Sequence, residues 1–485
     1  MLQPYVVLIV KGGRLFAMSN LQSTAPSSNN SPWLKQEIVD TAKLFGPIFL
    51  GQIATTATGV VDTVMAGAAG AQHLAGVSIG ASFFWPTCLF VIGLALIIQP
   101  TVAQLRGAKD FGRIAPEVYL ATVVILAVSV VLSIATCFLP YAFTLLPNVN
   151  QEMIYIGKWY LYTTAAGIPG FALFAIMRNY WEGLGITLPS SVFGFFALFI
   201  NIPLNYIFIF GKFGAPELGG IGCGVATTLT VYLTVILMYF YVRTSPNFTR
   251  CRLFECTYTI TFKQVKKYLM ISTPLAFSTT IEMACFSLVA FFLAPFGPIT
   301  IASHSVAMNV SGVIFMIPLS LASAVAIRVG ACLGANNWKG ADKAAKAAFV
   351  LGLIFYISYF SILFFFKENI VALYSSDSEV QILGATLLIF CLIYLLPENI
   401  MTVASGVVRG FKDTKTIFLI TIFIYWVIGL PIGLVLCYGF VTSEPLSAQG
   451  FWIGFICALS SGCVLYTARI IYLFKRHYLP KTFTS

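Results

Sequence analysis

The chain has 485 residues, of which 59% are hydrophobic and only 9% are charged. Soluble proteins carry about 25% charged residues, so this composition excludes a soluble domain and indicates a multi-pass membrane protein. The net charge of +11 would suit a nucleic-acid partner. Its distribution along the chain, described below, follows membrane topology instead, and we expect no nucleic acid to bind.

Residues 1–40 are predicted to form a disordered cytoplasmic tail. The apolar run at 5–10 is too short to span a bilayer, and its positive charges follow it, which is the reverse of a signal peptide. A polar stretch begins at Met18. We therefore expect residues 1–17 to be an extension from an upstream start.

Apolar runs separated by short polar loops predict about twelve membrane-spanning helices, each near the ~20 residues that a bilayer requires. A long basic loop divides them into six and six. The predicted organisation is an N-terminal lobe at 41–243, a cytoplasmic linker at 244–266, a C-terminal lobe at 267–476 and a cytoplasmic tail at 477–485. The predicted spans lie at 44–66, 75–99, 117–140, 155–177, 189–211, 220–242, 268–295, 301–326, 347–366, 381–408, 416–439 and 449–474.

The basic residues fix a predicted orientation for these spans. With the N-terminus in the cytoplasm, 25 of the 28 Lys and Arg fall in cytoplasmic segments. The exceptions are Lys158, Lys212 and Lys367. This asymmetry follows the positive-inside rule and places both termini in the cytoplasm.

Weak internal similarity predicts that the two halves arose by duplication. At a constant offset of 227, identical residues recur: Gly70, Ala75, Ser78, Gly107 and Ala108 fall on Gly297, Ala302, Ser305, Gly334 and Ala335. The polar loops at 105–113 and 332–340 also correspond. Repeats of six spans share one topology, so we expect an axis along the membrane normal and a central cavity between the lobes.

Three acidic residues fall well within predicted spans: Asp62, Glu282 and Glu398. A charge inside hydrocarbon costs about 2.5 kcal/mol or more, so such residues usually face a cavity and mark a site. No Lys or Arg is predicted at mid-membrane to pair with them. They are candidates to bind a proton or a hard cation such as Na+, and Glu282 with Glu398 is the candidate metal site. The structural alternative is a protonated acid hydrogen-bonded to a neighbouring helix.

Other residues near these acids suggest how a cation would be held. Pro397 precedes Glu398, so a kink there would free backbone carbonyls for a cation. Tyr394 lies one turn before Glu398, and an aromatic ring beside a carboxylate suits an organic cation. Asn201 and Asn205 share one helical face and could supply oxygen ligands. Plain helix packing is the alternative for all three of these side chains.

Several motifs are absent from the sequence. There is no GxxxxGK[ST] segment, which argues against an ATP-driven pump. Only three His occur, and no cluster of His, Asp or Glu is predicted at the membrane surface. We therefore predict no enzyme, no catalytic residues and no cofactor beyond a coupling ion.

Four segments together resemble the multidrug and toxic compound extrusion (MATE) transporters, with the NorM-like bacterial branch nearest. They are GVVDTVMAGAAGAQHLAGVSIGAS (59–82), NIPLNYIFIFGKFGAPELGGIGCGVATTL (201–229), RVGACLGANNWKGA (328–341) and ASGVVRGFKDTK (404–415). The resemblance runs from about residue 35 to residue 476.

This resemblance implies an all-α V-shaped bundle of two six-helix lobes that exports organic cations by Na+ or H+ antiport. It implies coupling roles for Asp62 and Glu282. Glu398 stands where the family carries Asp, a departure of one methylene that keeps the charge and bears on ion preference. Tyr394 matches a family Tyr. The implied setting is a monomer in the bacterial inner membrane, whose partners are the lipid bilayer and small organic cations.

Two other functions were weighed against antiport. A lipid-linked glycan flippase of the same superfamily usually has extra spans and more basic residues in its central cavity. An integral membrane enzyme would need a polar constellation at the membrane surface. The absence of predicted mid-membrane Lys or Arg disfavours an anionic substrate and hence the flippase.

Overall fold

The computed structural model describes residues 33–141, 151–251, 253–254, 258–441 and 444–478. Within these residues the chain is helical, and twelve helices are long and apolar enough to cross a membrane. This confirms the predicted all-α fold with twelve spans. The proposed extension at 1–17 lies outside the described residues.

The helices fall into two sets of six spans. The first set contains α1 (Trp33–Ala69), α2 (Ala71–Ala95), α3 (Ile98–Gly107), α4 (Ile114–Thr136), α5 (Gln151–Gly183), α6 (Leu188–Phe210) and α7 (Gly220–Thr244), with α2 and α3 forming one span. The second contains α8 (Phe262–Leu293), α9 (Pro298–Gly334), α10 (Trp338–Ala372), α11 (Ser378–Gly410), α12 (Thr414–Ile422), α13 (Leu430–Cys437) and α14 (Ala448–Tyr478). A π-helix at Phe423–Gly429 joins α12 to α13 within one span.

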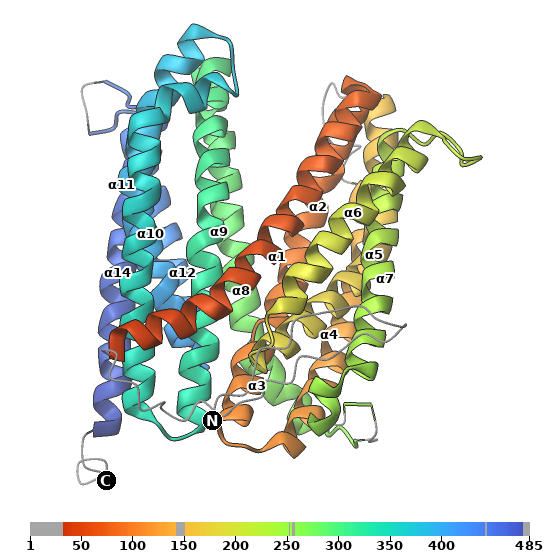
Figure 1. Cartoon of the computed structure of the whole chain (residues 1–485). Helices are drawn as coiled ribbons and strands as arrows, with labels where there is room; N and C mark the ends of the chain where they lie inside the picture. Colours follow the sequence, from red (N-terminus) through yellow and green to blue (C-terminus); the bar gives the residue numbers. More distant parts are fainter. Residues whose placement is uncertain (1–32, 142–150, 252, 255–257, 442–443, 479–485) are drawn as a thin grey trace.

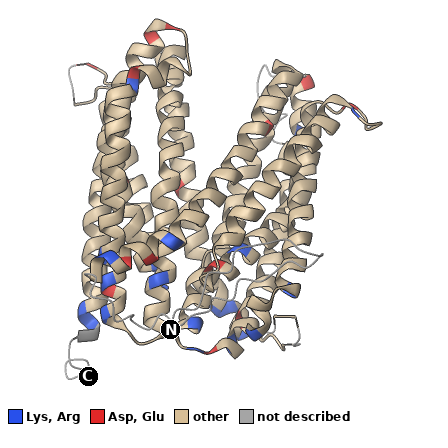
Figure 2. Cartoon of the chain, in the orientation of Figure 1, with Lys and Arg blue, Asp and Glu red and all other residues tan. Residues whose placement is uncertain are grey.

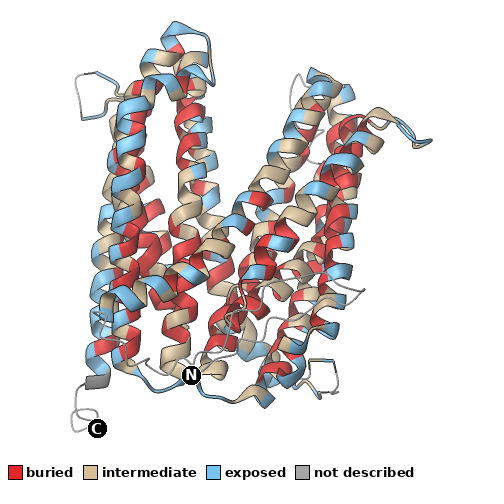
Figure 3. Ribbon diagram, viewed as in Figure 1, coloured by how far each residue is buried: buried red, intermediate tan, exposed pale blue. Residues whose placement is uncertain are grey.

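The spans form two bundles that meet at the end where α14 finishes and diverge toward the other end (Figure 1). We call α2–α7 the N-lobe and α9–α14 the C-lobe. Each lobe has its own hydrophobic core, and buried residues concentrate where helices face one another inside a lobe (Figure 3). The resulting shape is the V expected from the sequence.

The first helix of each half begins on one lobe and continues on the other. Phe45 of α1 packs on Phe355 of α10, with ring centroids 4.8 Å apart, whereas Gly51 lies against the backbone of Ser190 in α6. In α8, Ala276 packs on Gly93 of α2 before the helix joins the C-lobe. The ends of α1 and α8 therefore fasten the lobes to each other.

Helix α1 begins eight residues earlier than the sequence predicted. The expected disordered tail at 1–40 is wrong for residues 33–40, which form the first turns of α1. Their carboxylates have a partner in the C-lobe: Arg328 donates to Glu37 at 2.5 Å, and Asp40 lies 3.8 Å away. The predicted linker is also shortened, since α8 begins at Phe262 behind a capping box formed by Thr261 and Gln264.

Lys and Arg gather at the end of the molecule where the lobes meet, while few appear at the diverging ends (Figure 2). This segregation is the three-dimensional counterpart of the charge distribution seen in the sequence.

Candidate functional site

Glu282 lies on α8, half buried, and faces the π-helix of the C-lobe. The hydroxyl of Tyr425 donates to Glu282 Oε1 at 2.8 Å, and the neighbouring Trp426 donates its ring N–H to the carbonyl of Ile281 at 3.3 Å. A π-helix shifts side chains relative to a regular helix and occurs frequently at functional sites. Sequence reasoning missed Tyr425, because nothing in its own segment indicates the acid that it contacts.

Glu398 lies on α11 and is only 5% exposed. Tyr394, one turn earlier on the same helix, donates its hydroxyl to Glu398 Oε1 at 2.5 Å. The second oxygen, Oε2, is buried and has no hydrogen-bond partner among the described residues. The tyrosine partners of Glu398 and Glu282 are connected by ring contacts that run through Phe455 and Phe286. This pair of acids, with one free oxygen, is a place where a proton or a cation would be stabilised.

An aromatic cluster joins the surroundings of the two acids. The ring of Tyr394 packs edge-on against Trp452 at 5.4 Å and near Phe455 at 6.3 Å. Phe286 bridges Phe455, at 4.8 Å, and Tyr425, at 5.7 Å. Aromatic rings beside carboxylates attract organic cations through their negative faces, so the cluster suits such a ligand.

Asp62 lies on α1, in the half that packs on the N-lobe, and makes a separate polar site. Asn205 donates to its Oδ1 at 2.7 Å, and Thr227 donates to its Oδ2 at 2.8 Å. The same amide of Asn205 is 2.8 Å from Asn201 Oδ1. The structure therefore brings together three residues singled out in the sequence, and adds Thr227, which the sequence did not indicate.

The candidate residues thus form two groups rather than one. Glu282, Glu398 and Tyr394 belong to the C-lobe site, and Asp62, Asn201 and Asn205 to the N-lobe site. The ion pairs within the described residues involve other acids, so none of these carboxylates is neutralised by a Lys or Arg there.

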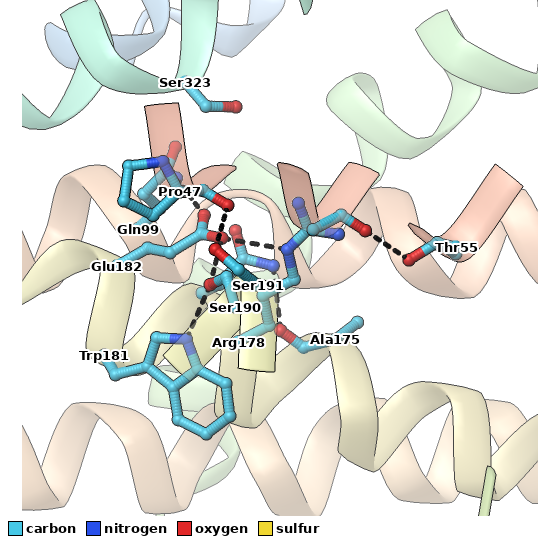
Figure 4. A network of polar contacts seen from close by, with 12 residues as sticks. Pro47, Thr55, Gln99, Ala175, Arg178, Trp181, Glu182, Ser190, Ser191 and Ser323 are labelled. Atoms are coloured by element: carbon cyan, nitrogen blue, oxygen red, sulfur yellow. Dashed lines mark hydrogen bonds and ion pairs between the residues drawn. The ribbon is translucent and has the colours of Figure 1, made fainter. Parts of the chain in front are cut away.

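A third polar network surrounds Glu182 at the end of α5 (Figure 4). Glu182 is only 3% exposed. It accepts hydrogen bonds from Arg178 at 2.8 Å, Ser190 at 2.7 Å and Gln99 at 2.7 Å. The sequence placed this acid at the end of a span, where acids are ordinary. The four-residue spacing from Arg178 was the one available sign of an ion pair.

Comparison with known proteins connects this architecture to a family. The family model described as MatE matches the chain twice, over residues 47–207 and 274–435. The two matches begin 227 residues apart, the offset at which the sequence repeats align, so the duplication is confirmed.

Relatives match over nearly the whole chain. The multidrug resistance protein NorM of Vibrio cholerae serotype O1 is 38% identical over 443 residues, covering 91% of this chain and 97% of the relative. The probable multidrug resistance protein NorM of Idiomarina loihiensis is 37% identical, covering 91% and 96%.

Solved structures share the fold at lower identity. The eukaryotic MATE transporter AtDTX14 superposes with a TM-score of 0.81 at 22% identity, covering 91% of this chain and 96% of that one. A multidrug resistance MATE family transporter of the MOP superfamily, in an outward-facing conformation, gives 0.80 at 17% identity, covering 93% and 100%. From the family model and the relatives together, the chain belongs to the MatE family.

Proposed function

We propose that this protein exports amphipathic, mostly cationic organic compounds across the bacterial inner membrane in exchange for Na+ or H+. Its family and the names of its relatives make it a membrane transporter rather than an enzyme, and those names connect it with multidrug efflux. One observation carries the coupling proposal: Glu282 and Glu398, the two carboxylates of the C-lobe site, each have a single tyrosine donor and no basic partner among the described residues.

The orientation follows from the charges. Lys and Arg concentrate at the end where the lobes meet, and by the positive-inside rule that end faces the cytoplasm. The lobes diverge at the opposite end, which in this proposed orientation faces outward, and we refer to this arrangement as outward-open. We use "inner end" below for the end where the lobes meet.

The proposed mechanism is competition between an ion and the drug for the same negative charge. Binding of the coupling ion at Glu282 and Glu398 neutralises the C-lobe site and displaces a cationic drug. The ion also favours the outward-open state, which it does only by binding that state more tightly. Asp62, with Asn201 and Asn205, provides a second ion site in the N-lobe. Each chain contains both lobes, so a monomer suffices and no other cofactor is required.

Efflux of ethidium from proteoliposomes tests this proposal. One arm applies a Na+ pulse at fixed pH, and the other a pH jump without Na+; the arm that drives efflux identifies the coupling ion. In that arm, Glu282→Gln is expected to lose ion-driven efflux. Glu368→Gln serves as control, because this acid is 81% exposed and lies far from the C-lobe site in sequence. Full ion-driven efflux by Glu282→Gln would refute the central role of the carboxylate.

A further inference from the structure

The inner end of the molecule is closed by a seam between α3 and α9, where backbones touch. A Cβ atom on Gly107 would lie 2.0 Å from the carbonyl oxygen of Ala331, and one on Gly334 would lie 1.9 Å from that of Gln104. The side chain of Gln104 also donates to the carbonyl of Gly410 at 2.8 Å. The helices therefore meet directly across the boundary between the lobes, without side chains to separate them.

This seam lies on the axis that relates the two repeats. Gln104 and Ala331 are 227 positions apart, as are Gly107 and Gly334, so the two close contacts are copies of each other. A Cβ atom placed on Gly330 would lie 3.2 Å from the Cβ of Ala103, which occupies the same position in the first repeat. Residues that touch their own equivalents must be located at the axis.

The same offset relates Glu182 to Arg409, at the inner ends of α5 and α11. Each is followed by a glycine, and these glycines pack in the same way. Gly183 lies against Gln99 and Val102, and Gly410 lies against their equivalents, Ala326 and Val329. One ancestral position therefore carries an acid in the N-lobe and a base in the C-lobe.

Both charges are buried beside the seam. Glu182 is 3% exposed and Arg409 is 7% exposed. Arg409 reaches one side-chain acceptor, Ser323 Oγ at 3.4 Å, and its Nε has no partner among the described residues. A buried guanidinium so poorly hydrogen-bonded requires a nearby opposite charge. Glu182 is the buried acid on the other side of the seam, although its carboxylate does not lie within 4 Å of Arg409 among the described ion pairs. Helix α3 contacts both positions, because Gln99 donates to Glu182 at 2.7 Å and Gln104 donates to the carbonyl of Gly410, next to Arg409, at 2.8 Å.

We propose that Glu182 and Arg409 form a charge pair that holds the inner ends of the lobes together in the outward-open state. They are positioning residues that touch neither drug nor coupling ion. The inference rests on the proposed function, because a transporter that takes up drug from the cytoplasm must part these ends. When the inner ends separate, Arg409 moves away from Glu182. Arg178 stays beside Glu182, because both residues are on α5.

The test measures the opening of the seam directly. Spin labels are attached at Ala108 and Ala335, which are exposed and lie at the ends of α3 and α9, in full-length protein whose eleven cysteines have been replaced. Distances are recorded in nanodiscs without drug or ion gradient. We expect a short distance to dominate in the parent protein. Glu182→Gln and Arg409→Gln should each lower the ratio of short to long distances roughly tenfold.

The double variant separates attraction from simple packing. Glu182→Gln leaves the buried Arg409 without an acid across the seam, whereas Arg409→Gln removes the base and leaves Glu182 paired with Arg178 at 2.8 Å. Either change removes the same attraction, so the double variant Glu182→Gln with Arg409→Gln should open less than the two effects combined. Arg409→Lys keeps the charge and should retain the short distance. Arg469→Gln is the matched control, since Arg469 pairs with Asp413 at 2.7 Å within the C-lobe and should not affect the seam.

Two results would overturn the inference: single variants with the parental distances, or effects that simply add in the double variant. Only protein that elutes as a single species in gel filtration is measured, and Arg409→Lys and the double variant remain informative if a single variant misfolds. Failure of the proposed function would show separately, as full ion-driven efflux by Glu282→Gln.

Discussion

Tyr394 and Glu398 lie one turn apart on α11, with the tyrosine hydroxyl 2.5 Å from Oε1 of the carboxylate. Tyr425 and Glu282 have the same chemical relationship at 2.8 Å, although their positions are 143 residues apart in the chain. Each C-lobe acid is therefore oriented by one phenol. In the first case the helix itself provides the partner, and in the second the π-helix of another span does.

Removing the phenol of Tyr394 should impair coupling. Tyr394→Phe leaves Glu398 without a side-chain donor, since its Oε2 already has no partner among the described residues. Loss of a hydrogen bond to a charged group costs about 1.5–3 kcal/mol, so we expect ion-driven ethidium efflux to fall roughly tenfold or more. Tyr356→Phe is the control, because its hydroxyl contacts only the carbonyl of Leu392, at 3.2 Å. Equal losses in both variants would contradict a specific role for Tyr394.

The N-lobe site allows a comparison between adjacent threonines. Thr227 donates to Asp62 at 2.8 Å, whereas Thr228 donates to the backbone carbonyl of Thr163 at 2.8 Å. Thr227→Val should lower ion-driven efflux several-fold, because one carboxylate oxygen of Asp62 loses its donor. Thr228→Val should leave efflux near the parental level. Initial rates at matched protein density decide between them, and a larger loss in Thr228→Val would argue against Asp62 as an ion site.

The seam between α3 and α9 should tolerate no added methyl group. Gly107→Ala would place a Cβ 2.0 Å from the carbonyl oxygen of Ala331, whereas a Cβ at Gly112, five residues later, meets nothing within 4 Å. Overpacking of this kind costs about 1–3 kcal/mol. We expect a lower Tm and longer distances between labels at Ala108 and Ala335 for Gly107→Ala only. Parental values for that variant would mean that the seam accommodates a methyl group without separating, and that the backbone contact is not tight.

The first turns of α1 should contribute to stability through Arg328. Glu37→Gln removes the charge from a partly buried pair and should lower the free energy of unfolding by about 2 kcal/mol, as for other hydrogen bonds to charged groups. Lys43→Gln is the control, since Lys43 is 70% exposed and 3.8 Å from Asp40, and exposed pairs contribute about 1 kcal/mol or less. Thermal unfolding in detergent measures both. An unchanged Tm for Glu37→Gln would show that the charge of Glu37 contributes nothing to holding the first turns of α1 against Arg328.

Much of this architecture was predictable because the relevant signals are local. Apolar runs of bilayer length gave twelve spans, and the offset of 227 proved to be the spacing of the two family matches. The sequence predicted that Asn201 and Asn205 would act together, since they share a helical face, and the structure places Asn205 against Asp62. The first turns of α1 were missed because Glu37 and Asp40 look like solvent-exposed residues until Arg328 of a distant helix is placed beside them.

Contacts between distant segments explain the other omissions. Thr227 and Tyr425 carry no charge and occur in ordinary apolar spans, so nothing marked them as partners of acids. Glu182 was recognisable only as a residue at the end of a span, because its burial depends on how α5 packs against α2, α3 and α6. Glu182 and Arg409 are separated by the repeat offset of 227 residues. An alignment of the two halves does not mark them, because an acid and a base at equivalent positions count as a mismatch.

The opposite charges of Glu182 and Arg409 also bear on which lobes can pair. If two N-lobes from separate chains met across the same seam, acid would face acid, and two C-lobes would bring guanidinium against guanidinium. Like charges buried face to face are strongly unfavourable, whereas the mixed pairing is attractive. Once the duplicated halves had diverged at this one position, each lobe would recognise the other half of its own chain in preference to a copy of itself during assembly in the membrane.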